Sequence, residues 1–180
     1  MLLDYNENRE KRVIQGRLLP MVKKPRLVAL AGPNILSYIE LYPPGVKYVQ
    51  VWENNAKIML TQIRELTSKP SPARIIDYRY GDIIDAEVRK DTFYDLDFCF
   101  TIKKARDYVH KFCHGAFTAT FSTRASSVDY TIQTLLEILG DKPILNIPHP
   151  YYNLLNTEKG KYMYTAYWDQ GPMISIFKFH

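Results

Sequence analysis

Short apolar runs alternate with helix-like stretches along most of this chain, and that alternation constrains the fold more than any other feature. The first run, RLVALA at 26–31, is almost entirely apolar, which is typical of a strand buried on both faces. It stops at Gly32, and the next residue, Pro33, suits the first position of a helix because its φ is fixed and its missing N–H is not needed there. We therefore predict a strand, a glycine turn and a helix that runs to about Leu41.

The alternation continues to about residue 140. We predict further strands at 46–53, 73–80, 92–100 and 116–124, and helices that begin after Asn54 or Asn55, at residue 102 and after Ser126 or Ser127. In the first of these helices the apolar residues recur at helical spacing and predict one apolar stripe: Ala56, Met59, Leu60, Ile63 and Leu66. Strands that alternate with helices imply a parallel sheet with helices on both faces.

The pattern changes towards the end of the chain. Residues 146–160 include two prolines and predict an irregular stretch. Residues 161–168 and 173–180, joined by the turn DQGP, predict a β-hairpin. The predicted fold class is therefore α/β, a three-layer sandwich around a mostly parallel sheet that ends in a C-terminal antiparallel hairpin.

The composition favours a globular domain over a membrane or disulfide-stabilised protein. With 180 residues, 46% of them hydrophobic and 24% charged, the chain is long enough to bury a core as one domain. No apolar run approaches the ~20 residues that cross a bilayer, and the N-terminus lacks the apolar segment of a secretory signal. Cys99 and Cys113 form no CxxC pair, which suits a reducing compartment. We expect a cytoplasmic protein with no membrane partner.

The positive charge is concentrated at the N-terminus. The net charge of the whole chain is +5, and residues 1–26 carry seven Lys or Arg and three acids, or +4. We treat residues 1–25 as a basic arm that precedes the domain at 26–180. One interpretation is that the arm faces the phosphates of a nucleic acid, and the other is that it is a solvated leader.

The residues that end successive predicted strands carry the chemistry of a nucleoside site. In an open α/β sheet, ligands bind at the carboxyl ends of the strands. Gly32 ends the first strand, and Glu53 ends the second one 21 residues later, the spacing at which a carboxylate holds a ribose diol in nucleoside-binding sheets. Asp82 follows the third strand beside Gly81, and Asp97 lies in the fourth. Each of these alone is an ordinary turn residue or solvated acid, so only their order at the ends of successive strands indicates a ligand site.

Taken in order, LVALAGPN, VKYVQVWENN, RIIDYRYGDIID, FYDLDFCFT and the closing hairpin resemble a class I S-adenosylmethionine (SAM)-dependent methyltransferase. The resemblance spans residues 26–180 and implies that family's Rossmann-like, seven-stranded sheet in a single SAM-binding domain. It implies that the cofactor is SAM and that the reaction is methyl transfer.

The resemblance also implies which residues form the site. Those expected to bind SAM are Ala31, Gly32, Pro33, Glu53, Asn54, Gly81, Asp82 and Ile83. The first three would pass the methionine part, Glu53 would bind the ribose hydroxyls, and Asp82 and Ile83 would flank the adenine. The catalytic positions, beside the methyl acceptor, are expected to be Asp97 and Phe98.

One segment departs from the family pattern. Class I methyltransferases usually show an acid and two or three glycines after the first strand, whereas ALAGPN has a single glycine and no acid. The missing glycines weigh more heavily against a dinucleotide enzyme, because a pyrophosphate needs close backbone approach and SAM carries no phosphate. A methyltransferase-like fold that has lost catalysis is therefore the alternative to an active enzyme.

The expected acceptor is a base of RNA or DNA. Enzymes that methylate exocyclic base amines commonly show Asp or Asn, Pro and an aromatic residue beside the methyl group, and Asp97-Phe98 keeps the acid and the aromatic. Asp97 would orient the acceptor or take its proton, unless it is a strand-end acid bonded to the start of the next helix. Tyr151 and Tyr152 are candidate substrate-binding residues that could stack on a base, although plain packing explains them as well.

Two further expectations concern metals and partners. In HKFCH, His110 and His114 have metal-ligand spacing, but a complete site needs another ligand and none is visible, so we expect no metal. A homo-oligomer or a partner subunit would add substrate contacts to a chain with little room for a recognition domain. The sequence thus predicts a SAM-dependent methyltransferase acting on nucleic acid, and the alternative is a catalytically decayed fold serving as a nucleic-acid-binding or accessory module.

Overall fold

The computed structural model describes residues 22–68, 74–98, 101–113, 115–124, 128–139, 145–151 and 161–168. Their contacts divide the chain into two compact units, one up to Asp95 and one from Leu96 onwards. Each unit has its own helices and strands, and each is described by itself.

The N-terminal unit contains a parallel sheet, as the sequence predicts. Its elements are β1 (Arg26–Ala29), α2 (Ile35–Glu40), β2 (Tyr48–Glu53), α3 (Ala56–Ser68), β3 (Ile75–Tyr80), the 3-10 helix η3 (Ile83–Asp85) and the first four residues of β4 (Thr92–Asp97), whose last two belong to the other unit. The four strands lie in the order β3-β2-β1-β4, and every neighbouring pair is parallel. The first four residues of β4 pair with β1, from Arg26 opposite Thr92 to Ala29 opposite Asp95.

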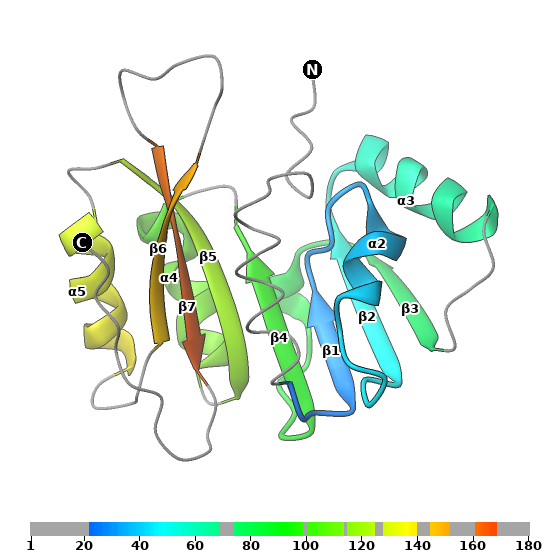
Figure 1. The fold of residues 1–180 in the computed structure, drawn as a ribbon, viewed down its shortest axis with the longest axis horizontal. Coiled ribbons are helices and arrows are strands. Elements are labelled where there is room, and N and C mark those ends of the chain that lie inside the picture. Colours follow the sequence, from blue (N-terminus) through cyan, green and yellow to red (C-terminus); the bar gives the residue numbers. More distant parts are fainter. Residues whose placement is uncertain are drawn as a thin grey trace. The chain divides into compact units, whose positions relative to one another are not determined.

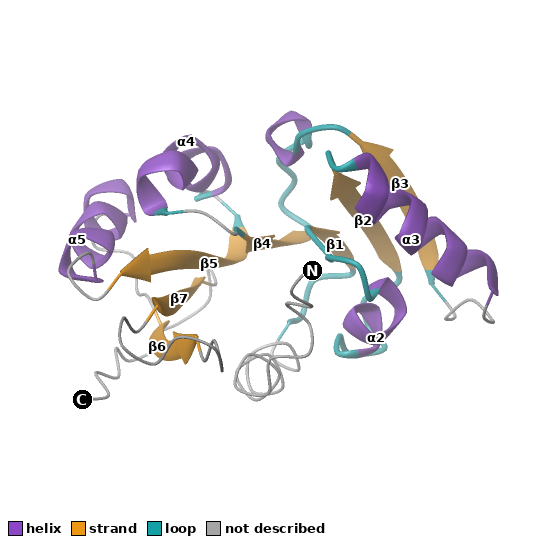
Figure 2. Ribbon diagram, turned by 90° about the horizontal axis from the view of Figure 1, so that it is seen from above, coloured by secondary structure: helices purple, strands orange, loops and turns teal. Residues whose placement is uncertain are grey.

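Alternation along the strands gives this sheet two different faces. Figure 2 shows α2 and α3 on one side of the strands and η3 on the other. The face towards α2 and α3 is apolar in β1, β2 and β4, where the buried side chains are Leu27, Ala29, Val49, Val51 and Phe93. Ile35 and Ile39 of α2 are also fully buried, so the core of this unit lies between the sheet and α2.

The turn after β1 takes more residues than the sequence predicts. α2 begins at Ile35 with Asn34 as its N-cap residue, so the prediction that Pro33 opens the helix is wrong. Gly32 has φ 64°, a left-handed conformation that glycine adopts without a steric penalty. The Tyr38 N–H donates to the Asn34 carbonyl at 3.1 Å, which makes Asn34 the first residue of the helical ladder. β1 ends at Ala29, two residues before the predicted end, so the connection from strand to helix occupies residues 30–34.

Helix α3 packs on the sheet with a polar side. Gln62 is fully buried, and the half-buried Glu65 accepts from the backbone N–H of Leu36 at 3.4 Å. Leu60 and Ile63, two members of the predicted apolar stripe, are 51% and 39% exposed. Met59 and Leu66 of the same stripe are half-buried, so the packed face of α3 only partly coincides with the predicted stripe. The helix start agrees with the sequence, because Asn55 Oδ1 accepts from the Lys57 N–H at 3.0 Å.

The C-terminal unit combines two helices with antiparallel strands. Its elements are α4 (Ile102–Phe112), β5 (Ala116–Arg124), α5 (Val128–Leu139), β6 (Leu145–Tyr151) and β7 (Lys161–Trp168). β7 lies between β5 and β6 and is antiparallel to both. The buried side chains of this unit include Val109 and Phe112 of α4, Phe117 and Ala119 of β5, and Leu135 of α5.

The strand β6 corrects the prediction that the chain is irregular from residue 146. Pro148 and Pro150 are two residues apart, so their missing N–H groups fall on the same side of the strand. Prolines are tolerated in a strand that pairs on one side only, and β6 pairs only with β7 among the described strands. β5 and β7 have the predicted bounds, whereas residues 173–180, the second arm of the predicted hairpin, lie outside the described residues. Of the helices that the structure describes, none is both long and apolar enough to cross a bilayer.

Candidate cofactor site at the strand ends

The predicted cofactor residues follow the carboxyl ends of three neighbouring parallel strands. Ala31, Gly32 and Pro33 come after β1, Glu53 and Asn54 end and follow β2, and Gly81, Asp82 and Ile83 come after β3. We call these eight residues the strand-end cluster. Because β1, β2 and β3 are adjacent and parallel, their carboxyl ends lie at the same edge of the sheet.

A hydrogen-bond chain connects the glycine turn to the other strands. The buried Gln62 side chain on α3 donates from Nε2 to the Gly32 carbonyl, and its Oε1 accepts from the Tyr78 hydroxyl on β3. Burial and the nearby Glu53 carboxylate raise the pKa of the Tyr78 phenol, which keeps the hydroxyl protonated as a donor. A side chain of α3 thus stabilises the turn at Gly32, in a segment that lacks the additional glycines usual in class I methyltransferases.

Glu53 and Asp82 are the two carboxylates of the cluster, and Glu53 is the one at the end of β2. Its Oε1 accepts from the Asn55 N–H at 2.7 Å, at the start of α3. Burial raises the pKa of Glu53, while the backbone N–H groups of Asn55 and Asn54 oppose that rise. The Gly81 N–H donates to the Glu53 carbonyl at 3.1 Å, which joins the ends of β2 and β3. Asn54, predicted to bind cofactor, is exposed beside Glu53.

The residues after β3 form a second turn. Gly81 has φ 150°, outside the range that other residues readily adopt. Asp82 is the N-cap of η3, and its Oδ1 accepts from the Ile84 N–H at 3.0 Å. Ile83 is 2% exposed, so its side chain belongs to the interior in this structure. Asp82 is therefore the polar side chain that this turn contributes to the cluster.

Asp97 and Phe98, the predicted catalytic residues, fall in the C-terminal unit. Asp97 is the last residue of β4 and is half-buried. Phe98 is 1% exposed, and its ring packs edge-to-face on Tyr108 of α4 with the centroids 5.1 Å apart. Thr101 is the N-cap residue of α4 but makes no capping bond with its side chain. The Phe98 ring is thus engaged by α4 in this conformation.

The other candidate residues lie apart from the cluster in sequence. Tyr151 ends β6, and Tyr152 and His114 lie outside the described residues. His110 is exposed on the last turn of α4, and Cys113 is buried, with its Sγ 3.0 Å from the His110 carbonyl. Within the described part of the chain, no group of three or more His, Cys, Asp or Glu side chains could hold a metal ion.

Sequence reasoning missed the residues that support the cluster. Gln62 and Tyr78 were not predicted to act there, and neither was Asp95, which is 4% exposed and accepts from the hydroxyls of Tyr38 and Tyr42. Asp95 joins α2 to β4, and its carbonyl accepts from the Leu30 N–H at 3.2 Å, just before the glycine turn. No signal in the sequence marked Gln62, because it lies outside the predicted apolar stripe and a lone glutamine on a helix is ordinarily exposed.

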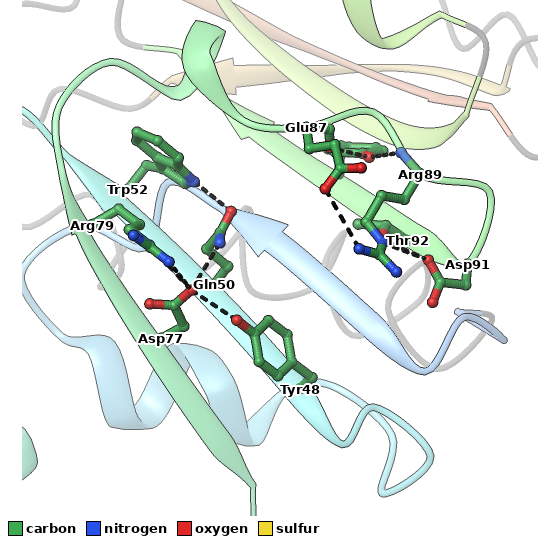
Figure 3. Close-up of polar contacts among 10 residues, drawn as sticks. Tyr48, Gln50, Trp52, Asp77, Arg79, Glu87, Arg89, Asp91 and Thr92 are labelled. Atoms are coloured by element: carbon green, nitrogen blue, oxygen red, sulfur yellow. Dashed lines mark hydrogen bonds and ion pairs between the residues drawn. The ribbon is translucent and has the colours of Figure 1, made fainter.

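The opposite face of the same sheet is polar (Figure 3). Asp77 Oδ2 accepts from Tyr48, Gln50 and Arg79, and Trp52 Nε1 donates to Gln50 Oε1 at 2.8 Å. Burial alone would raise the pKa of Asp77, but these hydrogen bonds together outweigh it and lower the pKa. A cleft of about 260 Å³ lies between this network and the segment after η3. Gln50 and Trp52 of its lining bond to each other, Tyr48 and Arg79 bond to Asp77, and none of the lining residues belongs to the strand-end cluster.

The strand-end cluster fits a nucleoside without phosphate groups better than a dinucleotide. Glu53 offers a carboxylate of the type that accepts from ribose hydroxyls, and Asp82 offers one near the position expected for an exocyclic amine. The turn after β1 has one glycine, Gly32, which allows one close backbone approach there, whereas a pyrophosphate requires several. The residues present therefore fit SAM, which has a ribose and an adenine but no phosphate.

Comparisons with known proteins bear on the fold. No protein-family model matches the sequence, and no curated protein is similar to it in sequence. Among solved structures, a SAM-dependent O-methyltransferase from Thermotoga maritima superposes with a TM-score of 0.59 at 13% identity, over 92% of this chain and 67% of that one. An rRNA methylase from Streptococcus thermophilus gives a TM-score of 0.58 at 8% identity, over 89% and 95% of the two chains.

A third solved structure extends the range of chemistry. The N-methyltransferase NodS from Bradyrhizobium japonicum WM9 gives a TM-score of 0.57 at 11% identity, over 93% of this chain and 99% of that one. The three proteins are named for different acceptors but share one fold. The chain therefore has the fold of class I SAM-dependent methyltransferases, as its sequence motifs indicate.

Proposed function

We propose that this chain is a SAM-dependent methyltransferase that acts on nucleic acid. The observation that carries the proposal is the strand-end cluster, in which a left-handed glycine, a carboxylate and a second glycine-acid turn follow three adjacent parallel strands. We also propose that residues 26–180 form one domain with a seven-stranded sheet that ends in antiparallel strands. The fold shared with methyltransferases of several kinds supports both parts.

The side chains of the cluster would divide the binding of SAM among them. Gly32 would let the backbone approach the methionine part, with its carbonyl held away from the ligand by Gln62. Glu53 Oε1 is bonded to the Asn55 N–H, so Oε2 is the atom assigned to the ribose hydroxyls. Asp82 would accept from the adenine amine, and Ile83 would support that turn from inside.

When bound, SAM supplies an electrophilic methyl group on a sulfonium sulfur. The protein then has to position an acceptor nitrogen or oxygen in line with that methyl and remove the proton the acceptor gives up. We assign the positioning and the proton to the Asp97 carboxylate at the end of β4. Phe98, packed on Tyr108, would fix the backbone that carries Asp97.

A nucleic-acid acceptor is supported by charge and by one of the similar folds. Residues 1–26 carry a net charge of +4, which favours contact with phosphates. One solved structure of similar fold, 95% of which this chain covers, is named as an rRNA methylase, and that name supports an RNA acceptor. Tyr151 and Tyr152 are proposed to stack on an exposed base.

A second function is favoured by one feature of the sequence. ALAGPN lacks the acid and the extra glycines of the family, so a binding module that no longer transfers methyl groups is the alternative. Such a module would hold RNA or DNA with steep salt dependence and would not bind SAM. An NAD-dependent enzyme is disfavoured by the same missing glycines.

Calorimetric titration of the purified protein with SAM and with S-adenosylhomocysteine tests the proposal, with NAD as the control ligand. We expect micromolar binding of both sulfur compounds and none of NAD. Glu53→Ala should weaken that binding by about 2 kcal/mol, roughly a 30-fold loss of affinity, because a charge-assisted hydrogen bond is lost. A matched control is Glu87→Ala, which removes an exposed carboxylate outside the cluster.

The same titration separates the alternatives. A folded sample that binds neither sulfur compound would contradict the enzyme proposal and favour a nucleic-acid-binding role. Binding of SAM that Glu53→Ala leaves unchanged would show that the ribose is held elsewhere. If both expected results are obtained, transfer of labelled methyl groups to rRNA, tRNA and DNA, compared with Asp97→Asn, identifies the acceptor class.

A further inference from the structure

Strand β3 is the outermost strand of the parallel sheet in the N-terminal unit (Figure 1). It pairs with β2 from Ile75 to Tyr80, and no other described strand of this unit lies beside it. Its sequence, IIDYRY, has no proline and no lysine, two residues that commonly protect an exposed edge. The outer side of β3 is thus chemically able to pair with another strand.

Alternation along β3 decides which backbone groups face outward. The Ile75 N–H donates to the Lys47 carbonyl at 2.9 Å, and the Gly81 N–H donates to the Glu53 carbonyl at 3.1 Å. Odd-numbered residues of β3 therefore bond to β2. The N–H and C=O groups of the even-numbered residues face away from the sheet, and these are Ile76, Tyr78 and Tyr80.

A second copy of β3, placed antiparallel, pairs all of these outward groups in one register. With Tyr78 opposite Tyr78 of the second copy, Ile76 lies opposite Tyr80, and no outward group within the strand is left over. A shift of two residues leaves Ile76 or Tyr80 without a partner. It also sets Asp77 against Asp77, or Arg79 against Arg79, and like charges directly opposite each other destabilise a strand pair.

In the register centred on Tyr78, the charges are complementary. Asp77 lies opposite Arg79 of the second copy, and the two-fold axis repeats the pair. Within one copy, Arg79 donates from Nε and Nη2 to Asp77 Oδ2 at 3.1 and 3.0 Å, which leaves Oδ1 and Nη1 for the contact between copies (Figure 3). Both side chains are accessible, since Arg79 is 55% and Asp77 23% exposed.

The surface beside this edge is apolar. Tyr80 is 63% exposed, and Leu60 and Ile63 of α3 are 51% and 39% exposed. Glu65 bonds to Leu36 of α2, and Ile63 lies about 200° around the helix from Glu65, so Ile63 is on the side of α3 away from α2. The exposed part of the α3 stripe, Leu60 and Ile63, therefore lies towards the β3 edge of the unit and is available to a partner.

We propose that this chain forms a symmetric dimer with a second copy of itself, in which two antiparallel β3 strands meet at Tyr78. The paired strands continue the sheet across the two-fold axis, and the α3 stripes of both copies cover the new strand pair on one face. The dimer follows from the edge alone and does not depend on the proposed methyltransferase activity.

Sedimentation equilibrium over a range of protein concentrations tests the dimer. The wild-type protein should dimerise, and Ile63→Lys should raise the dissociation constant at least tenfold because it buries a charge in the contact. Thr61→Lys is the matched control, since Thr61 is exposed on the same helix outside the stripe, and it should leave the constant unchanged. Arg79→Glu should also weaken the dimer, because each Glu then faces Asp77.

The two α3 substitutions, Ile63→Lys and Thr61→Lys, should leave the far-ultraviolet circular dichroism and the melting temperature of the monomer unchanged, so a loss of folding can be recognised. A wild-type protein that is monomeric throughout the range would overturn the proposal. So would a dimer that withstands both Ile63→Lys and Arg79→Glu.

Hydrogen exchange tests the register without any substitution. The amides of Ile76, Tyr78 and Tyr80 should exchange more slowly above the dissociation constant than below it. The amides of Asp77 and Arg79, which bond to β2, should be protected at both concentrations. A dimer whose even-numbered β3 amides show no concentration dependence has its interface elsewhere, and the proposal is then wrong.

Discussion

The two faces of the parallel sheet in the N-terminal unit each present an aspartate that accepts from tyrosine hydroxyls, but the two aspartates lie in opposite environments. Asp95, on the face covered by α2 and α3, is 4% exposed, and its donors are Tyr38 and Tyr42. Asp77, on the other face, has a 23% exposed side chain and an arginine among its donors. The same pair of residue types thus fixes a helix on one face and a solvent-accessible network on the other.

This difference separates residues that hold the site from residues that are free to meet partners. On the covered face, Asp95 and Gln62 are buried among helices that begin at the strand-end cluster, so their bonds fix the geometry of that cluster. On the open face, hydrogen bonds run between neighbouring strands and reach the sheet edge at Arg79. Substitutions on the covered face should therefore change stability and cofactor binding together.

The largest effect is expected for Asp95→Ala. It removes the acceptor of two buried hydroxyls, which then lie 2.8 Å apart with no carboxylate to bond. We expect the free energy of unfolding to fall by about 3 kcal/mol, as measured by urea denaturation. Asp95→Asn, which keeps an acceptor oxygen, should lose clearly less. Equal losses for both variants would show that the charge of Asp95, rather than its hydrogen bonds, stabilises the fold.

The next effect is expected for Gln62→Met, which keeps the size of the side chain and removes both hydrogen bonds. The Gly32 carbonyl and the Tyr78 hydroxyl lose their buried partner, so stability should fall by about 2 kcal/mol. Because Gly32 is in the cluster, the affinity for S-adenosylhomocysteine should fall as well. Gln62→Met with unchanged affinity and lower stability would limit Gln62 to a packing role.

A smaller effect is expected for Asp77→Asn on the open face, about 1 kcal/mol at neutral pH. The folded-state pKa of Asp77 is below its ordinary value, so its contribution is present above that ordinary value of about 3.9 and is lost as the pH falls through the folded pKa. The difference between wild type and variant in urea denaturation should therefore shrink in acid. A difference that is constant with pH would contradict an ionic origin.

The smallest effect is expected for Glu53→Gln, which should raise rather than lower the free energy of unfolding at neutral pH. Burial raises the folded-state pKa of Glu53, so the wild type loses stability as the pH rises from the ordinary glutamate pKa through the folded one. The neutral variant should be more stable at neutral pH by about 0.5 kcal/mol after allowance for solvent screening, while it binds the cofactor more weakly. Thermal melts at pH 4 and pH 7 check this: the gain should appear only at the higher pH.

Much of the fold could be predicted from the sequence because its strands are locally encoded. β5 and β7 have the predicted bounds, since runs rich in Thr, Tyr and Phe favour strands. The face of α3 could not be predicted, because Gln62 is held by partners 30 and 16 residues away and periodicity counts only apolar residues. The predicted helix start at Pro33 is wrong for a similar reason, because the turn at Gly32 needs residues up to Asn34 before the hydrogen bonds of the helix begin.

The candidate site likewise contains residues that the sequence predicts and residues that it does not. The order of Gly32, Glu53 and Asp82 along the chain placed them after successive strands, because parallel strands bring their carboxyl ends to one edge. The residues that support them, Gln62 and Tyr78, come from the middle of a helix and a strand, where no motif marks them. The methyl acceptor depends on side chains outside these elements, and it stays a proposal.

Amide chemical shifts of the isotopically labelled protein, recorded as S-adenosylhomocysteine is added, test the central claim most directly. The account predicts that the amides of Gly32, Asn54 and Asp82 shift together with one dissociation constant. Residues of the open face such as Gln50 should change little. Shifts confined to the open face, or none at saturating ligand in a folded sample, would contradict a nucleoside site at the strand ends.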